Sequence, residues 1–350
     1  MSKINIRSPY FINLATTNLT SAKLEIDIYT GVANTSWQSS PQYTLTSTAI
    51  DEKINFEIAE LVKDYITALF DGDFPTVPVS LTEATTIFVD YRVTETINTT
   101  TQTPVDVLGE RAFYGYGYFE DGANPSFNNI YYLQTNNKII KNKNETVTIP
   151  VDNTIATTLV WKYQGTTIST ISIAAETKIE NQITYVTSTG ISDVDEVEIS
   201  TGVKTTTAYI ESFEECKYTP YKLTFINKYG AYQDIWFFKN SKLAMTTEKD
   251  KYKSNILNNG TYETYNAQIR LLSKNANQRL TLNSGYYPES NNEVFKQLFL
   301  SDKVWIKYDN KTLAVNIENN NIDFKTSLTD SLINYTIDVS FAFNTINNIR

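Results

Sequence analysis

Three tyrosines alternate with two glycines between residues 114 and 118, and no other short pattern in the sequence is better suited to hold a ligand. In a strand, Tyr114, Tyr116 and Tyr118 would share one face, and Gly115 and Gly117 would leave the other face as bare backbone. Flat rings with a phenolic hydroxyl suit stacking on sugars. Close packing of another strand or subunit over the glycines is the alternative, and we favour it.

Trp236 is a fourth aromatic residue that the pattern sets apart as an interface or glycan-binding candidate. It lies in the stretch 223–238, where two alternating apolar runs flank a turn, which is typical of a hairpin. Trp236 and Phe238 have the opposite phase to Ile235 and Phe237, so both faces of the second strand are apolar. One face must therefore meet another layer, as in the interior of a β-sandwich.

Carboxylates offer the other chemistry that the residue types allow. A glycosidase needs two of them set about 5 to 9.5 Å apart across a cleft. The chain has 39 acidic residues, and nothing in the local sequence picks out a pair. The acids closest to the tyrosine pattern are Asp90, Glu110, Glu120 and Asp121. We expect no catalytic residues, so the chain is predicted not to be an enzyme.

Cofactor and metal chemistry are also disfavoured. The chain has no histidine, which excludes imidazole catalysis and histidine-bound zinc, and Cys216 is its single cysteine. An acidic segment contains Asp193, Asp195, Glu196 and Glu198, but its spacing does not match an EF-hand loop. We expect no cofactor and no metal site.

Charge and hydropathy limit the partners. The net charge is −9, the isoelectric point is near 4.8, and lysines and arginines form no long run. Nucleic acid binding needs a basic footprint, so it is disfavoured. The N-terminus lacks a continuous apolar segment, and no stretch approaches 18 apolar residues. We therefore expect synthesis in the cytoplasm and no membrane insertion.

The composition predicts a mainly β fold. Tyr, Phe, Ile, Val and Thr are abundant, and all of them favour strands. A length of 350 residues suggests two or three domains, which we predict to be β-sandwich-like. The expected domains are an N-terminal β-sandwich with one helix (1–142), a small Ig-like sandwich (143–212) and a C-terminal β domain with one capped helix (213–350).

Two short amphipathic helices are expected. Apolar residues recur at helical spacing from Ile58 to Leu69, and Gly72 follows at a position where a C-terminal glycine would end the helix. Ser290 and Glu293 have capping-box spacing before a second apolar stripe that reaches Phe299.

The strands predicted near the C-terminal end indicate whether the chain needs a neighbouring copy to pair with. Residues 267–272 and 279–282 are predicted as separate strands, and 332–343 as one long apolar strand. A strand of that length and character needs partners on both edges. If the domain does not supply both, a neighbouring chain must.

Several of these segments resemble structural proteins of tailed bacteriophages that infect Bacteroidota. The resemblance lies in Ser21–Gly31, Phe225–Phe238, Leu332–Ile337 and Phe341–Phe343. It implies a non-catalytic virion subunit, either a ring or a tail-tip or baseplate component. Such a subunit would form a homo-oligomeric ring, bind other tail proteins and be located in the virion.

Three alternatives stay open. One is a neck or collar component of the virion. The second is a carbohydrate-binding adhesin whose tyrosines stack on a host surface glycan. The third is a tail enzyme that degrades polysaccharides.

Overall fold

The computed structural model describes residues 3–72, 74, 86–152, 154–175, 183–188, 193–324 and 332–346. It is mainly β, with several sheets in a sandwich-like architecture and two short α-helices in the described part, which confirms the predicted fold class. The chain divides into two compact units, which are described one at a time. Unit 1 contains residues 1–214, 224–235 and 290–301, and unit 2 contains 215–223, 236–289 and 302–350.

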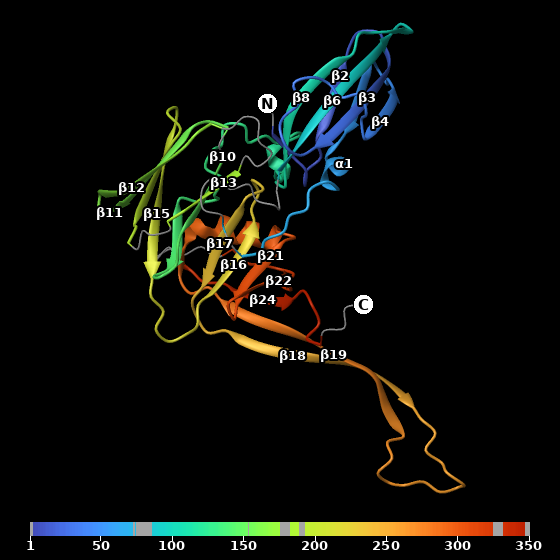
Figure 1. Ribbon diagram of the computed structural model, residues 1–350, viewed down its shortest axis with the longest axis vertical. Coiled ribbons are helices and arrows are strands. Elements are labelled where there is room, and N and C mark those ends of the chain that lie inside the picture. Colours follow the sequence, from blue (N-terminus) through green and yellow to red (C-terminus); the bar gives the residue numbers. More distant parts are fainter. Residues whose placement is uncertain are drawn as a thin grey trace. The chain divides into compact units, whose positions relative to one another are not determined.

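The first sheet of unit 1 has the strand order β1-β8-β6-β3-β4, and β7 pairs with β6 (Figure 1). Its strands are β1 (Lys3–Asn5), β3 (Leu19–Tyr29), β4 (Tyr43–Thr48), β6 (Thr86–Ile97), β7 (Thr100–Thr101) and β8 (Val105–Phe113). A separate pair is formed by β2 (Phe11–Ala15) and β5 (Lys53–Glu57). Leu24, Ile26 and Ile28 alternate on the buried face of β3, as the sequence predicts.

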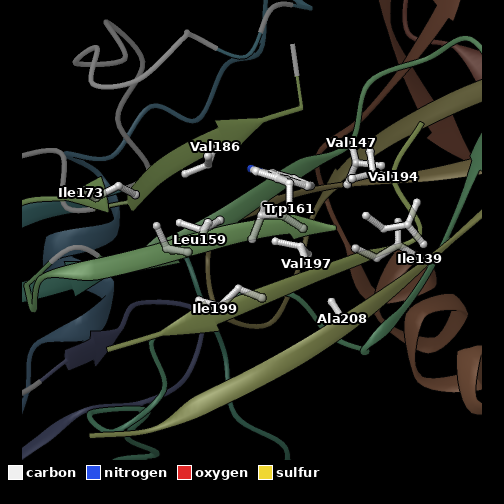
Figure 2. Close-up of a cluster of buried hydrophobic side chains, with 13 residues drawn as sticks. Ile139, Val147, Leu159, Trp161, Ile173, Val186, Val194, Val197, Ile199 and Ala208 are labelled. Carbon is white, nitrogen blue, oxygen red and sulfur yellow. The ribbon is translucent and has the colours of Figure 1, made fainter. Parts of the chain in front are cut away.

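The second sheet of unit 1 has the order β12-β11-β14-β15-β9, and β10 pairs with β13. The strands are β9 (Lys138–Asn142), β10 (Thr148–Asp152), β11 (Thr157–Tyr163), β12 (Thr166–Ile173), β13 (Ile183–Thr187), β14 (Glu196–Ser200) and β15 (Thr205–Phe213). Trp161 is fully buried at the centre of its apolar cluster, among Leu159, Val197 and Val147 (Figure 2). Positive φ angles at Gln164 and Gly165 form the predicted hairpin turn between β11 and β12.

The first predicted helix is much shorter than expected. Helix α1 spans only Ala59–Lys63, and beyond it Ile66, Ala68 and Phe70 are buried while the residues between them are exposed. This alternation has the period of extended chain, and it buries Ala68 and Phe70 in place of Tyr65 and Leu69, which belonged to the helical stripe and are exposed. The prediction of one helix up to Leu69 was wrong for that reason.

The second predicted helix is confirmed, but its capping box is wrong. Helix α2 spans Asn292–Leu300 and follows a single 3-10 turn, Glu289–Asn291, so Ser290 lies inside that turn. The N-cap is Asn291, and no side chain caps it. The Glu293 carboxylate instead accepts hydrogen bonds from Tyr118 Oη at 2.6 Å and Gln297 Nε2 at 2.8 Å.

One seven-stranded sheet organises unit 2, with the order β17-β16-β21-β22-β24-β19-β18 (Figure 1). Its strands are β16 (Tyr221–Ile226), β17 (Tyr232–Phe237), β18 (Lys242–Lys253), β19 (Ile269–Asn283), β21 (Val304–Tyr308), β22 (Lys311–Ile317) and β24 (Thr336–Phe341). The hairpin predicted at 223–238 is present as β16 and β17, and the boundary between the units passes within both strands.

The last predicted strand is divided into two. Residues 332–333 form β23, which pairs with β20 (Tyr287–Pro288), and β24 begins at Thr336. Strand β24 lies between β22 and β19 and is paired on both edges within its own sheet. The apolar C-terminal strand therefore has both of the partners that the sequence analysis required, and both belong to its own chain.

The three predicted domains stay a prediction. The end of the first run of unit 1, at residue 214, lies next to the predicted boundary at 212, but unit 1 contains both of the sheets assigned to the first two domains.

Candidate assembly surface

The most exposed element of unit 2 is a hairpin of β18 and β19 that continues beyond the sheet. The two strands pair from Lys242–Thr281 to Lys253–Ile269, whereas β24 pairs only with Arg279–Asn283 of β19. Beyond that point the ribbon is essentially two-stranded (Figure 1). Residues 245–278 are called the arm from here on. From Met245 to Lys253 alone, a rise of about 3.3 Å per residue gives a length of about 30 Å.

Half of this arm was not predicted from the sequence. Strand β18 was not predicted, and β19 was predicted as two separate strands although it is continuous. The available signal was the spacing of Lys249, Lys251 and Lys253, which places three like charges on one face of an extended chain.

The arm is almost completely open to solvent. Every residue from Lys242 to Lys274 except Ser254 and Ile256 is exposed. Nine of the 25 large exposed hydrophobic side chains in the described part of the chain lie in this short span. They include Tyr265, which is 82% exposed, and Leu272, which is 73% exposed. A two-stranded ribbon is marginally stable in water, and concentrated exposed apolar surface marks an interaction site.

The two faces of the arm differ in charge. Paired residues share a face, so Lys249 and Lys274 lie together, and Lys251 and Lys253 pair with Leu271 and Ile269 on the same side. This side is called the lysine face. The opposite face carries pairs such as Asp250 with Ser273, whose hydroxyl donates to the carboxylate at 2.6 Å.

The tip of the arm has local order. Asn258 and Thr261 exchange two backbone hydrogen bonds, at 2.8 and 3.0 Å, around Asn259 and Gly260, which both have positive φ. This is the geometry of a tight hairpin turn. The tip therefore displays Tyr262 and Tyr265 from a shaped loop rather than from a disordered one.

The segment from the start of β18 to the end of β19 (242–283), which includes the arm, has the opposite charge to the rest of the chain. Residues 242–283 contain seven basic and three acidic side chains, a net charge of +4. The remaining 23 basic and 36 acidic residues give the rest of the chain a charge of −13. The arm of one molecule is thus electrostatically complementary to the body of another.

The tyrosine pattern forms a packed loop, not an exposed strand. Strand β8 ends at Phe113, and Tyr114 and Tyr116 are only 5% and 7% exposed. Tyr118 is half-buried, with Lys296 Nζ 3.6 Å from its ring centroid and Lys228 Nζ at 5.0 Å. The three rings are therefore not available as the exposed platform for sugars that the sequence suggested.

The two glycines of this loop allow close backbone packing. A Cβ at Gly115 would lie 2.6 Å from the Lys228 carbonyl oxygen and 2.7 Å from Asn5 Oδ1. A Cβ at Gly117 would lie 2.4 Å from Pro125. The favoured interpretation, close packing over the glycines, agrees with this geometry, and the packed segment belongs to the same chain.

Trp236 is a core residue of unit 2. It is 5% exposed, and its ring stacks on Phe238 with centroids 6.2 Å apart. The buried hydroxyl of Tyr287 donates to its carbonyl oxygen at 2.7 Å. Trp236 thus serves packing within the unit.

The acids near the tyrosine pattern do not come together as a catalytic pair. Asp90 and Glu110 are buried on β6 and β8, whereas Glu120 and Asp121 are exposed on a 3-10 turn. Asp90 accepts hydrogen bonds from Gly109 N at 2.6 Å, Asn34 Nδ2 at 2.9 Å and Tyr29 Oη at 3.0 Å. These bonds tie a loop to the sheet, which is a structural role.

Three acids of the acidic segment 193–198 have partners within the chain. Glu196 and Glu198 form ion pairs with Lys162, and Asp195 accepts a hydrogen bond from Gln164 N, so these acids already have protein partners. Among the described residues no group of three or more acids or cysteines is placed to hold a metal ion, and Cys216 is exposed. The same residues contain no helix long and apolar enough to cross a bilayer.

A buried ion group in unit 1 could not be identified from the sequence. Asp152 is fully buried and binds Lys3 Nζ at 2.5 Å and Arg111 Nη1 at 3.1 Å. Burial alone would raise the pKa of Asp152, but Lys3 and Arg111 outweigh it and hold the pKa below its usual value. The group connects β1, β8 and β10, so its role is to stabilise unit 1.

Comparison with protein-family models, with curated proteins and with solved structures finds no match for this chain.

Proposed function

We propose that this chain is a non-catalytic assembly subunit whose arm packs against a second copy of the same chain. The exposed arm is the observation that carries the proposal. A two-stranded ribbon with exposed apolar side chains gains stability when another surface covers it, because burial removes apolar area from water at about 25 cal/mol per Å².

A second copy is the partner that the charges favour. The lysine face suits an acidic surface, and the rest of the chain has a charge of −13. Lysines along β18 also protect its free edge against simple strand addition, which favours docking through a face rather than through the edge. An arm that reaches from one subunit to the next makes a heterologous contact, which generates rings or open filaments.

We place such an assembly in a bacteriophage virion, as a ring or as a tail-tip or baseplate component. The support is the resemblance of residues 21–31, 225–238, 332–337 and 341–343 to virion structural proteins, together with an arm suited to contacts between subunits. Other tail proteins would be further partners of the assembled form.

Removal of the arm tests this proposal. Ala244 and Arg279 are directly paired, so an Asn-Gly turn between them should close a shortened hairpin without disturbing the sheet. Light scattering coupled to gel filtration should show a defined oligomer for the full chain and a monomer for the shortened one. An unchanged oligomer after removal of the arm, or a full-length monomer at every concentration, would overturn the proposal.

Charge reversal gives a milder test with a matched control. Lys249→Glu, Lys251→Glu and Lys253→Glu together should weaken the oligomer, because the lysine face would then repel an acidic partner. The control reverses Lys53, Lys217 and Lys311, three exposed lysines outside the arm. The control should assemble as the wild type does, because total charge is the same in both variants.

A further inference from the structure

A cavity of about 610 Å³ lies in unit 1 where strand β15 loses a neighbour. Strand β9 pairs with β15 only from Tyr209 onward, so the edge of residues 205–208 has no described strand beside it. Thr205, Thr206 and Thr207 line the cavity along this edge, and the opposite walls come from residues 130–137 and Tyr229. The volume is within the usual range of about 300 to 1,000 Å³ for ligand sites.

Hydroxyl groups dominate the side chains that line this cavity. The hydroxyls of Thr206, Thr207 and Tyr209 make no hydrogen bond to the described residues. Each of them can both donate and accept. Apart from Lys204, all of the lining side chains are uncharged and most of them are polar, so the site suits a neutral, polar ligand.

Two further side chains add to this character. Tyr209 is 56% exposed and presents an aromatic ring at the cavity. Gln134, another lining residue, is 7% exposed, and its Oε1 is buried with no hydrogen-bond partner among the described residues. A buried acceptor of this kind is uncommon in native proteins, and it marks this wall of the cavity as polar.

We propose that this cavity binds a neutral sugar ring of a polysaccharide or of a free saccharide. The Tyr209 ring would stack on the apolar face of the sugar, and the Thr206 and Thr207 hydroxyls would bond its hydroxyls. A peptide strand fits less well, because the open edge spans only residues 205–208, between β9 and the turn at 201–204. This site does not depend on the arm or on assembly.

Two variants with one control test the site on the full-length protein. The wild type should bind on an array of immobilised neutral polysaccharides. Saturation-transfer NMR with free glucose, galactose, mannose and N-acetylglucosamine shows whether a single ring suffices. Loss of the exposed Tyr209 ring in Tyr209→Ala should weaken binding about tenfold. Thr207→Val, which keeps the shape and removes the hydroxyl, should weaken it by a smaller factor.

The control is Tyr163→Ala, which removes an exposed tyrosine of β11 in the same sheet but outside the cavity lining. It should bind as the wild type does, and all variants should show the same thermal unfolding midpoint. A wild type that retains no saccharide in either assay would overturn the proposal. So would equal binding by wild type and Tyr209→Ala, equal loss in the control, or binding of peptides alone.

Discussion

The buried carboxylate of Asp152 pairs with two buried cations. We expect this single residue to contribute strongly to the unfolding free energy of the protein. Lys3 and Arg111 both contact it, and all three side chains are almost fully buried. Replacement of Asp152 by Asn should destabilise the protein by about 3 to 5 kcal/mol, because two charges would stay buried without their partner. Urea unfolding monitored by tryptophan fluorescence measures the change.

The matched control is Asp106→Asn. Its carboxylate pairs with Arg92 at 2.6 Å, but both side chains are about a third exposed. An exposed pair contributes about 0 to 1 kcal/mol, so this variant should unfold close to the wild type. Equal losses in the two variants would show that burial of the Asp152 group has no special effect.

The same carboxylate predicts a pH dependence. Its pKa in the folded protein is lower than in the unfolded chain, where the ordinary value is 3.8. The stabilisation is therefore complete above about pH 5 and is lost as the pH falls through 3.8 towards the folded pKa. Urea midpoints between pH 6 and pH 3 should fall more steeply for the wild type than for Asp152→Asn. Parallel curves would contradict this.

Gly115 gives a second prediction at the scale of the residue. The Cβ of Gly115→Ala would overlap the Lys228 carbonyl oxygen and Asn5 Oδ1. We expect a loss of about 1 to 3 kcal/mol in unfolding free energy, as is typical of overpacking. Gly165→Asn is the control, since its Cβ meets nothing within 4 Å and asparagine tolerates positive φ. It should stay within about 0.5 kcal/mol of the wild type.

At the scale of the element, the arm should change its dynamics on assembly. Its amides have only one partner strand and are surrounded by solvent, so they should exchange hydrogen rapidly in dilute protein. At concentrations that favour the oligomer, residues 248–274 should become protected, whereas β21 should be protected in both conditions. Exchange in the arm that does not depend on concentration would argue against its burial between subunits.

Elements with a buried face were predictable from the sequence, and elements without one were not. Strand β3 was recognised because Leu24, Ile26 and Ile28 alternate with polar residues. Strand β18 has no buried residue, so no apolar alternation revealed it. The stretch 58–70 was misassigned because its apolar spacing fits two periods, and only tertiary packing decides between them.

The candidate sites were also predictable only in part, because they depend on segments that are far apart in the sequence. The tyrosine pattern at 114–118 correctly indicated close packing over glycines, but the sequence does not show that the covering segment is the turn near Lys228. The sugar cavity depends on where β9 stops pairing with β15, a matter of register that the separate strand patterns do not contain.

At the scale of the whole molecule, opposite charges on the arm and on the rest of the chain predict an assembly that depends on salt. The arm region carries +4 and the remainder −13, so attraction between copies should be screened as ionic strength rises. Sedimentation velocity at 50 and 500 mM NaCl should show weaker association at high salt. Association that strengthens with salt would instead indicate an interface held by apolar contacts alone.

Cross-linking between differently labelled copies tests the central claim most directly. Equal amounts of ¹⁴N and ¹⁵N protein are mixed under assembling conditions and treated with a zero-length carbodiimide, which joins lysines to carboxylates in contact. We predict mixed-isotope links between Lys249, Lys251 or Lys253 and acidic residues outside 242–283. Links from these lysines only within single-isotope chains, or none at all, would contradict the proposal that the arm of one copy binds the body of another.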